Sequence, residues 1–244
     1  MKLTAGKQGF RAFNEQVREA LESCDTIDVE DVNGQRYIGA AMDKGKTLNL
    51  HGTPGNDMGA YLNGGKIEVF GNAQEAVGNT MGGGEIIIHG HTGDTLGYAM
   101  RDGEIYVRNR AGSRAGIHMK EFENMHPTVV IGGIAGAFLA EYMAGGTLII
   151  LGLNREPTQE IVGAHCATGM HGGKIYVRGE IPSQNISANI AVSDLNEEET
   201  AELKACVKKY CSLFKEDEEY IMKEKFYKLS PSSSRPYANL YTKN

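Results

Sequence analysis

The sequence has no tryptophan, only four cysteines and six prolines, and no long apolar run. No stretch approaches the ~20 apolar residues of a membrane-spanning helix. Its first seven residues carry no apolar run after their charges, which argues against a secretory signal. The cysteines (Cys24, Cys166, Cys206 and Cys211) form no CxxC pair and match no iron–sulfur ligand spacing. Four scattered thiols favour a cytoplasmic protein over a disulfide framework.

Basic residues are also in the minority. Lysine and arginine number 25 against 31 acidic residues, a formal net charge of −6, which argues against a nucleic-acid-binding protein. Apolar residues make up 41 % of the chain, enough to bury a core. A folded protein that does not act on nucleic acid is therefore expected.

Glycine is abundant but confined. Thirty of the 32 glycines lie between Gly34 and Gly179, and none follows Gly179. This distribution predicts three parts: an N-terminal helical segment (1–33), a glycine-rich domain (34–180), and C-terminal helices with an extended tail (181–244). No strict three-residue glycine period exists, so a collagen-like structure is excluded.

A strand-like segment recurs through the glycine-rich part. The seven copies start 19, 19, 19, 23, 20 and 27 residues apart: TLNLHG (47–52), KIEVFG (66–71), EIIIHG (85–90), EIYVRN (104–109), PTVVIG (127–132), TLIILG (147–152) and KIYVRG (174–179). One strand every ~20 residues is typical of a solenoid. We expect an all-β core: a right-handed, single-stranded parallel β-helix of about seven coils, with α-helices at both ends. A β-sandwich with glycine turns is the alternative.

Glycines at matching places in each repeat predict the corners of the coils. A corner needs positive φ or close backbone approach, and glycine allows both. The expected structural turn glycines are Gly59, Gly65, Gly78, Gly84, Gly97, Gly103, Gly116, Gly163 and Gly173.

Side chains alternate between the two faces of a strand. Counting from the first residue of each segment, the second and fourth positions should point inward; all of them are aliphatic except Thr128. On this register the outward positions of the fifth and sixth coils are Val129, Ile131, Ile149 and Leu151. Such an apolar outer face needs a cover, either a terminal helix of the same chain or a partner protein.

Two helices could provide that cover or close the ends of the column. Apolar residues follow helical spacing from Phe10 to Cys24 and from Leu203 to Phe214. Asn196 and Glu199 predict a capping box before the second helix. The segment Ser230–Tyr237 contains two prolines and is expected to be an extended strap or docking arm.

The search for chemistry finds little. His51 and His89 share an outward column but are two coils apart with Phe70 between them, too far for one metal ion. The glycines at 132–136 lack the βαβ context of a dinucleotide site. No phosphate-binding GxxxxGK[ST] loop or GxSxG nucleophile motif occurs. We therefore expect no catalytic residue, no cofactor site and no metal site.

Four arginines remain as a candidate site. Arg101, Arg108, Arg110 and Arg114 lie in adjoining coil segments and could form a basic strip for an anion or an acidic partner. The alternative is an ordinary solvated face.

The repeated units resemble a known family. GNDMGAYLNGGKIEV (55–69), VGNTMGGGEIII (77–88) and IVGAHCATGMHGGKIYV (161–177) look like the GXGXG domain, the C-terminal β-helix domain of the glutamate synthase large subunit. The resemblance covers about residues 30–180. The same domain type is similar to the C subunit of formylmethanofuran (molybdenum or tungsten) dehydrogenase. The helical tail and strap look more like a free-standing glutamate-synthase-domain protein.

The resemblance implies a structural role. In glutamate synthase this domain holds the glutaminase and the FMN and iron–sulfur domains together and carries no known catalytic residue. This chain lacks a cysteine at position two, iron–sulfur cysteines and room for an FMN barrel. The first hypothesis is a scaffold subunit, inactive alone, that organises glutaminase-like and FMN/iron–sulfur partners for glutamate synthesis, with self-association possible. The alternatives are a structural subunit of formylmethanofuran dehydrogenase or another oxidoreductase, and an independent left-handed β-helix acyltransferase.

Overall fold

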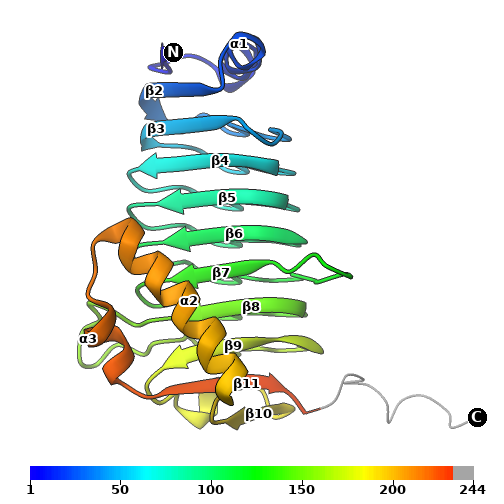
Figure 1. The fold of residues 1–244 in the computed structure, drawn as a ribbon, viewed down its shortest axis with the longest axis vertical. Helices are drawn as coiled ribbons and strands as arrows, with labels where there is room; N and C mark the ends of the chain where they lie inside the picture. The colour runs from blue at the N-terminus through cyan, green and yellow to red at the C-terminus, as the bar shows by residue number, and fades with distance from the viewer. Residues whose placement is uncertain (233–244) are drawn as a thin grey trace, which may run out of the picture.

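The computed structural model describes residues 1–232. Its centre is a column of stacked coils, each contributing one strand to a single large sheet (Figure 1). The strands run leftward across the front of the view, and the chain returns behind them while descending from the N-terminus, which makes the column right-handed. The predicted right-handed parallel β-helix with flanking helices is thereby confirmed. This hand and the single strand per coil do not match the left-handed architecture on which an acyltransferase would depend.

Parallel pairing joins consecutive strands along the column. The order runs β1-β2-β3-β4-β5-β6-β7-β8-β9-β11-β10. The parallel strands are β1 (Lys2–Thr4), β2 (Thr26–Asn33), β3 (Thr47–Thr53), β4 (Asn63–Phe70), β5 (Gly82–Ile88), β6 (Asp102–Val107), β7 (Thr128–Ile131), β8 (Ala144–Ile150) and β9 (Gly172–Arg178). The seven predicted strands are β3 to β9. The sheet begins earlier than the glycine-rich part, because Ile27, Val29 and Val32 of β2 add an apolar rung.

The two ends of the column are closed differently. At the N-terminal end, α1 (Phe10–Ser23) lies across the first coil and buries Phe13 and Val17 in the core (Figure 1). At the other end β11 (Phe226–Pro231) pairs antiparallel with β9, and β10 (Ile190–Ser193) pairs with β11. The short helix η1 (Ser183–Asn185) precedes β10. The outermost strand at the N-terminal end is the three-residue β1, and the other end finishes in the antiparallel β11 and β10, so neither end presents a long parallel edge.

The C-terminal helices lie on the outside of the sheet. α2 (Glu197–Phe214) crosses β6 to β9 obliquely, and α3 (Glu218–Lys223) follows it (Figure 1). The predicted capping box is present: the Asn196 side chain accepts from the Glu199 amide at 2.9 Å, and the Glu199 carboxylate accepts from the Asn196 amide at 3.0 Å. Of the expected strap, Ser230 and Pro231 form the end of β11, whereas Ser233–Tyr237 lie outside the described residues.

Fourteen aliphatic side chains of strands β3 to β9 point into the column. They come as two per coil: Leu48, Leu50, Ile67, Val69, Ile86, Ile88, Ile105, Val107, Val129, Ile131, Leu148, Ile150, Ile175 and Val177. The expected register is wrong in the fifth coil. Glu104 pairs with Thr128 rather than Pro127, so Val129 and Ile131 point inward and Val130 points outward. The connection before this coil is longer, and the strand register after it is shifted by one residue from the expected one. Such a shift moves every side chain of the strand to the other face.

The return path of each coil explains the repeated glycine. Alternate residues there have left-handed backbone, as at Ala76, Gly78 and Thr80 with φ of 56°, 67° and 52°. Their amides bond alternately to the next and the preceding coil: Ala76 donates to the Asp94 carbonyl, and Gly78 to the Met58 carbonyl, both at 2.9 Å. We call these stretches the αL segments: 37–41, 57–61, 76–80, 95–99, 114–118, 138–142 and 165–169. They form a second hydrogen-bonded ladder behind the sheet.

Of the three left-handed residues in an αL segment, the central one faces the core, beside a buried side chain such as Met58 or Val77. A Cβ on Gly78 would lie 2.6 Å from Ile105 Cδ1, and one on Gly59 would lie 2.7 Å from Ile86 Cδ1. Seven of the nine expected turn glycines have positive φ: Gly59, Gly78, Gly84, Gly97, Gly103, Gly116 and Gly173. At the other two, Gly65 and Gly163, an added Cβ would meet Met42 Cε at 2.7 Å and the Ala137 amide nitrogen at 2.6 Å.

Candidate functional site

The apolar outer face is real but has a different composition from the one expected. Ile149 and Leu151 do point outward, whereas Val129 and Ile131 belong to the interior of the column. The side chains that share the outer face with them are Ile87, Tyr106, Val130 and Tyr176. The face therefore extends over five consecutive strands, β5 to β9.

Helix α2 covers this face. Its Leu203, Val207, Tyr210 and Phe214 are buried and pack on it. The Tyr210 hydroxyl donates to the Arg108 carbonyl at 2.8 Å, which fixes the helix at the end of β6. A Cβ on Gly132 would lie only 1.9 Å from that hydroxyl oxygen, so the docked helix needs glycine there. Of the two covers considered from the sequence, the chain's own helix occupies this surface.

A polar cluster lies beneath the first half of α2. Glu202 accepts three bonds: from the Thr147 hydroxyl at 2.8 Å, the Tyr176 hydroxyl at 2.9 Å and the Lys174 ammonium at 2.6 Å. On the other side of Thr147, His126 Nε2 lies 2.9 Å from the hydroxyl oxygen, and His126 Nδ1 lies 3.0 Å from Glu121. Sequence analysis did not find this cluster, because its members come from four separate segments.

A hydroxyl, an imidazole and a carboxylate in a row are the parts of a nucleophilic triad. The proton positions are wrong for that role. The Thr147 hydroxyl gives its hydrogen to Glu202, so His126 Nε2 is left to donate to the oxygen, whereas a general base must accept. Thr147 is also completely buried, out of reach of a substrate. We assign the cluster a structural role: it holds α2 on the sheet.

This role predicts an acid-sensitive contact. Burial alone would raise the pKa of Glu202, but the bonds from Lys174, Thr147 and Tyr176 outweigh it and hold the pKa below its ordinary 4.5. The folded chain therefore binds this proton more weakly than the unfolded chain does. The carboxylate's contribution to stability is complete above about pH 4.5 and is lost as the pH falls further. We expect Glu202→Gln to lower stability at neutral pH and to flatten its decline in acid.

Chemical denaturation between pH 3 and pH 7 measures this effect. Glu198→Gln is the matched control, since Glu198 is an exposed carboxylate on the same helix. An acid dependence in Glu202→Gln equal to that of the wild type and the control would contradict the assignment.

The four arginines of the expected strip do not come together. Arg108, at the end of β6, pairs with Glu216 at 3.2 Å. Arg114, on an αL segment, pairs with Glu141 at 3.0 Å and lies over the Phe138 ring. Arg101 and Arg110 border two different hollows, one before β6 and one after it. A strand of six residues separates those positions by roughly 20 Å, so a single basic strip is wrong.

The hollow beside Arg110 measures about 230 Å³. Arg155 also borders it, but its guanidinium donates to the Gln159 carbonyl at 3.2 Å within the same loop. Burial, followed by the charge of Arg110, lowers the pKa of His91 at its rim. This hollow therefore offers one uncommitted cation beside a neutral imidazole.

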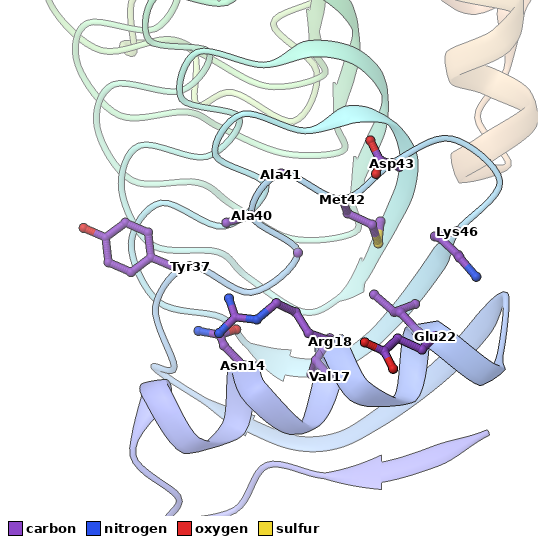
Figure 2. Close-up of a pocket in the computed structure, with 12 residues that line it drawn as sticks. Asn14, Val17, Arg18, Glu22, Tyr37, Ala40, Ala41, Met42, Asp43 and Lys46 are labelled. Atoms are coloured by element: carbon purple, nitrogen blue, oxygen red, sulfur yellow. The ribbon is translucent and has the colours of Figure 1, made fainter.

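A third hollow, of about 350 Å³, lies between α1 and the turn before β3 (Figure 2). Arg18 and Glu22 border it from the helix, and Asp43 and Lys46 from the turn (Figure 2). Lys46 already pairs with Asp25 at 2.8 Å, and Asp43 accepts a bond from Asn63 at 3.0 Å. Because two cations and two anions border this hollow, its charges favour neither a positive nor a negative ligand.

The thiols show no sign of catalytic activation. Burial raises the pKa of Cys166 to about 12 and of Cys211 to about 11, so both stay protonated and unreactive near neutral pH. Within residues 1–232 no group of three or more His, Cys, Asp or Glu side chains could hold a metal ion. No helix in this described part is long and apolar enough to cross a membrane.

Comparison with known proteins supports the repeat architecture described above. Residues 14–232 match the GXGXG motif family, which confirms the resemblance seen in the repeats. The uncharacterized protein MJ1350 of Methanocaldococcus jannaschii is 40% identical over 242 residues, covering 96% of this chain and 93% of that protein.

A solved structure shares the fold. It is the formyltransferase/hydrolase complex FhcABCD from Methylorubrum extorquens with methylofuran. The match has a TM-score of 0.62 and 22% identity and covers 76% of this chain and 67% of the matched chain.

Proposed function

The chain belongs to the GXGXG motif family, and from this premise we propose that it is a non-catalytic structural subunit of a multi-subunit enzyme complex. The observation that carries the proposal is the fold it shares with a chain of an assembled formyltransferase/hydrolase complex. The cluster around Thr147, in the described residues, also agrees with a non-catalytic role. In its triad-like arrangement the Thr147 hydroxyl is buried and donates its proton to Glu202, so it is not placed to act as a nucleophile.

Among such complexes we favour one that handles formyl groups, because the structural likeness is to a chain of a formyltransferase/hydrolase complex. A structural subunit of formylmethanofuran dehydrogenase, whose C subunit the same domain type resembles, would be of this kind. A split glutamate synthase is the second candidate. Its support is the resemblance of the repeated units at 55–69 and 77–88 to the β-helix domain of that enzyme's large subunit. Under this second candidate the partners are glutaminase-like and FMN/iron–sulfur subunits.

Affinity purification of the chain from its own organism, followed by mass spectrometry and an absorbance scan, tests the proposal. Recovery of formyl-transfer or molybdopterin subunits would support the first complex. A glutaminase-like protein and a yellow flavoprotein would support the second. Reconstitution then decides the role: full activity of the recovered partners without this chain would overturn it.

A further inference from the structure

A hollow of about 420 Å³ lies where the αL segments meet the starts of the strands. No residue of α2 or α3 borders it. Its polar and aromatic lining comes from Tyr98, Arg101, His118, Lys120, Tyr142 and His171. We call it the basic groove. Only Arg101 among these residues was singled out from the sequence.

The repeat of the coils aligns the groove along the column. Arg101, Lys120, Ala144 and His171 occupy the same position in four successive coils. Their amides donate to the carbonyls of the residues one coil earlier, at 2.8, 3.0, 2.8 and 2.9 Å. Neighbouring coils lie ~4.8 Å apart, so this row spans roughly 15 Å. The small side chain of Ala144 leaves the row hollow between Lys120 and His171.

Stacked rings make the adjoining side of the groove. The His118 ring stacks on Tyr142 with centroids 5.4 Å apart, and the edge of Tyr98 meets His118 at 6.0 Å. These residues project from αL segments whose backbone is fixed by the second ladder. The groove therefore offers a firm aromatic surface beside the cationic side chains of Arg101 and Lys120.

The charges of the groove have no counterpart among residues 1–232. No carboxylate of this part of the chain lines it. Within residues 1–232 neither Arg101 nor Lys120 makes an ion pair, whereas Arg108, Arg114 and Arg178 each do. In a chain of net charge −6, two adjacent unpaired cations form a local site for negative charge.

We propose that the basic groove docks an extended acidic segment of a partner protein. This inference rests on the proposed function, since a scaffold needs surfaces that partners recognise. Carboxylates of the segment pair with Arg101 and Lys120, and its flat groups pack on Tyr142 and His118. Arginine and tyrosine are the side chains that most often dominate binding between proteins.

Shape favours a polypeptide over a small molecule. Tyr98 and Tyr142 remain 37% and 39% exposed, so the groove is shallow. Small-ligand sites are clefts that bury ~70–90% of their ligand, and a shallow groove is poorly suited to that. A chain lying along the column can instead contact four coils at once.

The test uses the full chain and a fluorescein-labelled octaglutamate peptide, with octaglutamine as the neutral control. Fluorescence anisotropy at low salt should show binding of octaglutamate alone. Arg101→Ala/Lys120→Ala should weaken it about tenfold or more, because two charged contacts are lost. The matched control is Lys204→Ala/Lys208→Ala, which removes two exposed cations from α2 and should change binding less than about twofold.

A second variant tests the hollow separately from its charge. Ala144→Leu fills the row without altering any charge and should also weaken binding. Equal binding by wild type and Arg101→Ala/Lys120→Ala, or equal binding of the two peptides, would overturn the proposal. Displacement of the peptide by micromolar inorganic phosphate would overturn it too, in favour of a small-anion site.

Failure of this proposal is distinguishable from failure of the proposed function. If the double variant still recovers the same partners from cells, the scaffold role stands and the groove is not its docking surface. If the wild-type chain recovers no partner, the scaffold role fails, and peptide binding decides the groove by itself.

Discussion

Val207→Asp is expected to release α2 from the sheet. Val207 is completely buried against the outer face formed with Val130 and Ile149. The substitution removes about 1.5–3 kcal/mol of apolar burial. It also places a carboxylate in an apolar interior, where an ionised group is costly to bury. We expect a loss of about 4 kcal/mol or more, mostly as local detachment of the helix.

Hydrogen exchange of the α2 amides measures this loss directly, because stability in a repeat protein is not uniform. Ala205→Asp is the matched control: it adds the same charge to an exposed position of the same helix and should cost less than about 1 kcal/mol. Detachment also uncovers Ile149 and Leu151, so the variant should self-associate. Unchanged protection of α2 in Val207→Asp would show that the helix is not held by this face.

Gly78→Ala is expected to destabilise the column by about 2–5 kcal/mol. Left-handed backbone costs a residue with a Cβ roughly 1–2 kcal/mol. Here the new methyl group would also lie 2.6 Å from Ile105 Cδ1, inside a packed core. Overpacking of that kind costs typically ~1–3 kcal/mol more. Urea denaturation of the full chain measures the sum.

Ala76→Gly separates the two contributions. Ala76 has the same left-handed backbone, with φ of 56°, but its side chain faces outward. Removing that methyl group should be neutral or stabilise the chain by up to ~1 kcal/mol. If Gly78→Ala costs no more than this backbone contribution, the central glycine is not required by the core.

The sequence predicted the column from local, repeated signals. Aliphatic pairs such as Ile67 and Val69 recur in each copy with a glycine behind them, and stacked coils need both features. Its failure in the fifth coil has a simple cause. The sequence of the connection before β7 does not indicate how β7 is aligned with β6. Only the pairing of Glu104 with Thr128 shows that Val129 points inward.

The candidate sites depended on contacts that no local pattern reveals. Arg101 and Arg108 are close in sequence but lie at opposite ends of β6. Lys120 and His171 are distant in sequence, yet coil stacking places them in one row with Arg101. A search by residue number therefore grouped the wrong cations. Arg101, Lys120 and His171 each directly follow a methionine, and this shared place in the repeat could have shown the row.

By itself, the sequence determined the solenoid, its aliphatic interior, the glycine corners, the terminal helices and the capping box at Asn196, because each depends on residues close together in the chain. Tertiary structure alone decided which surface remains free. Docking of α2 depends on Tyr210, Val207 and Glu202 meeting side chains some 25 to 100 residues away. Within residues 1–232 that docking covers the apolar face but not the basic groove, and so it decides which of the two surfaces is left for the proposed partner segment.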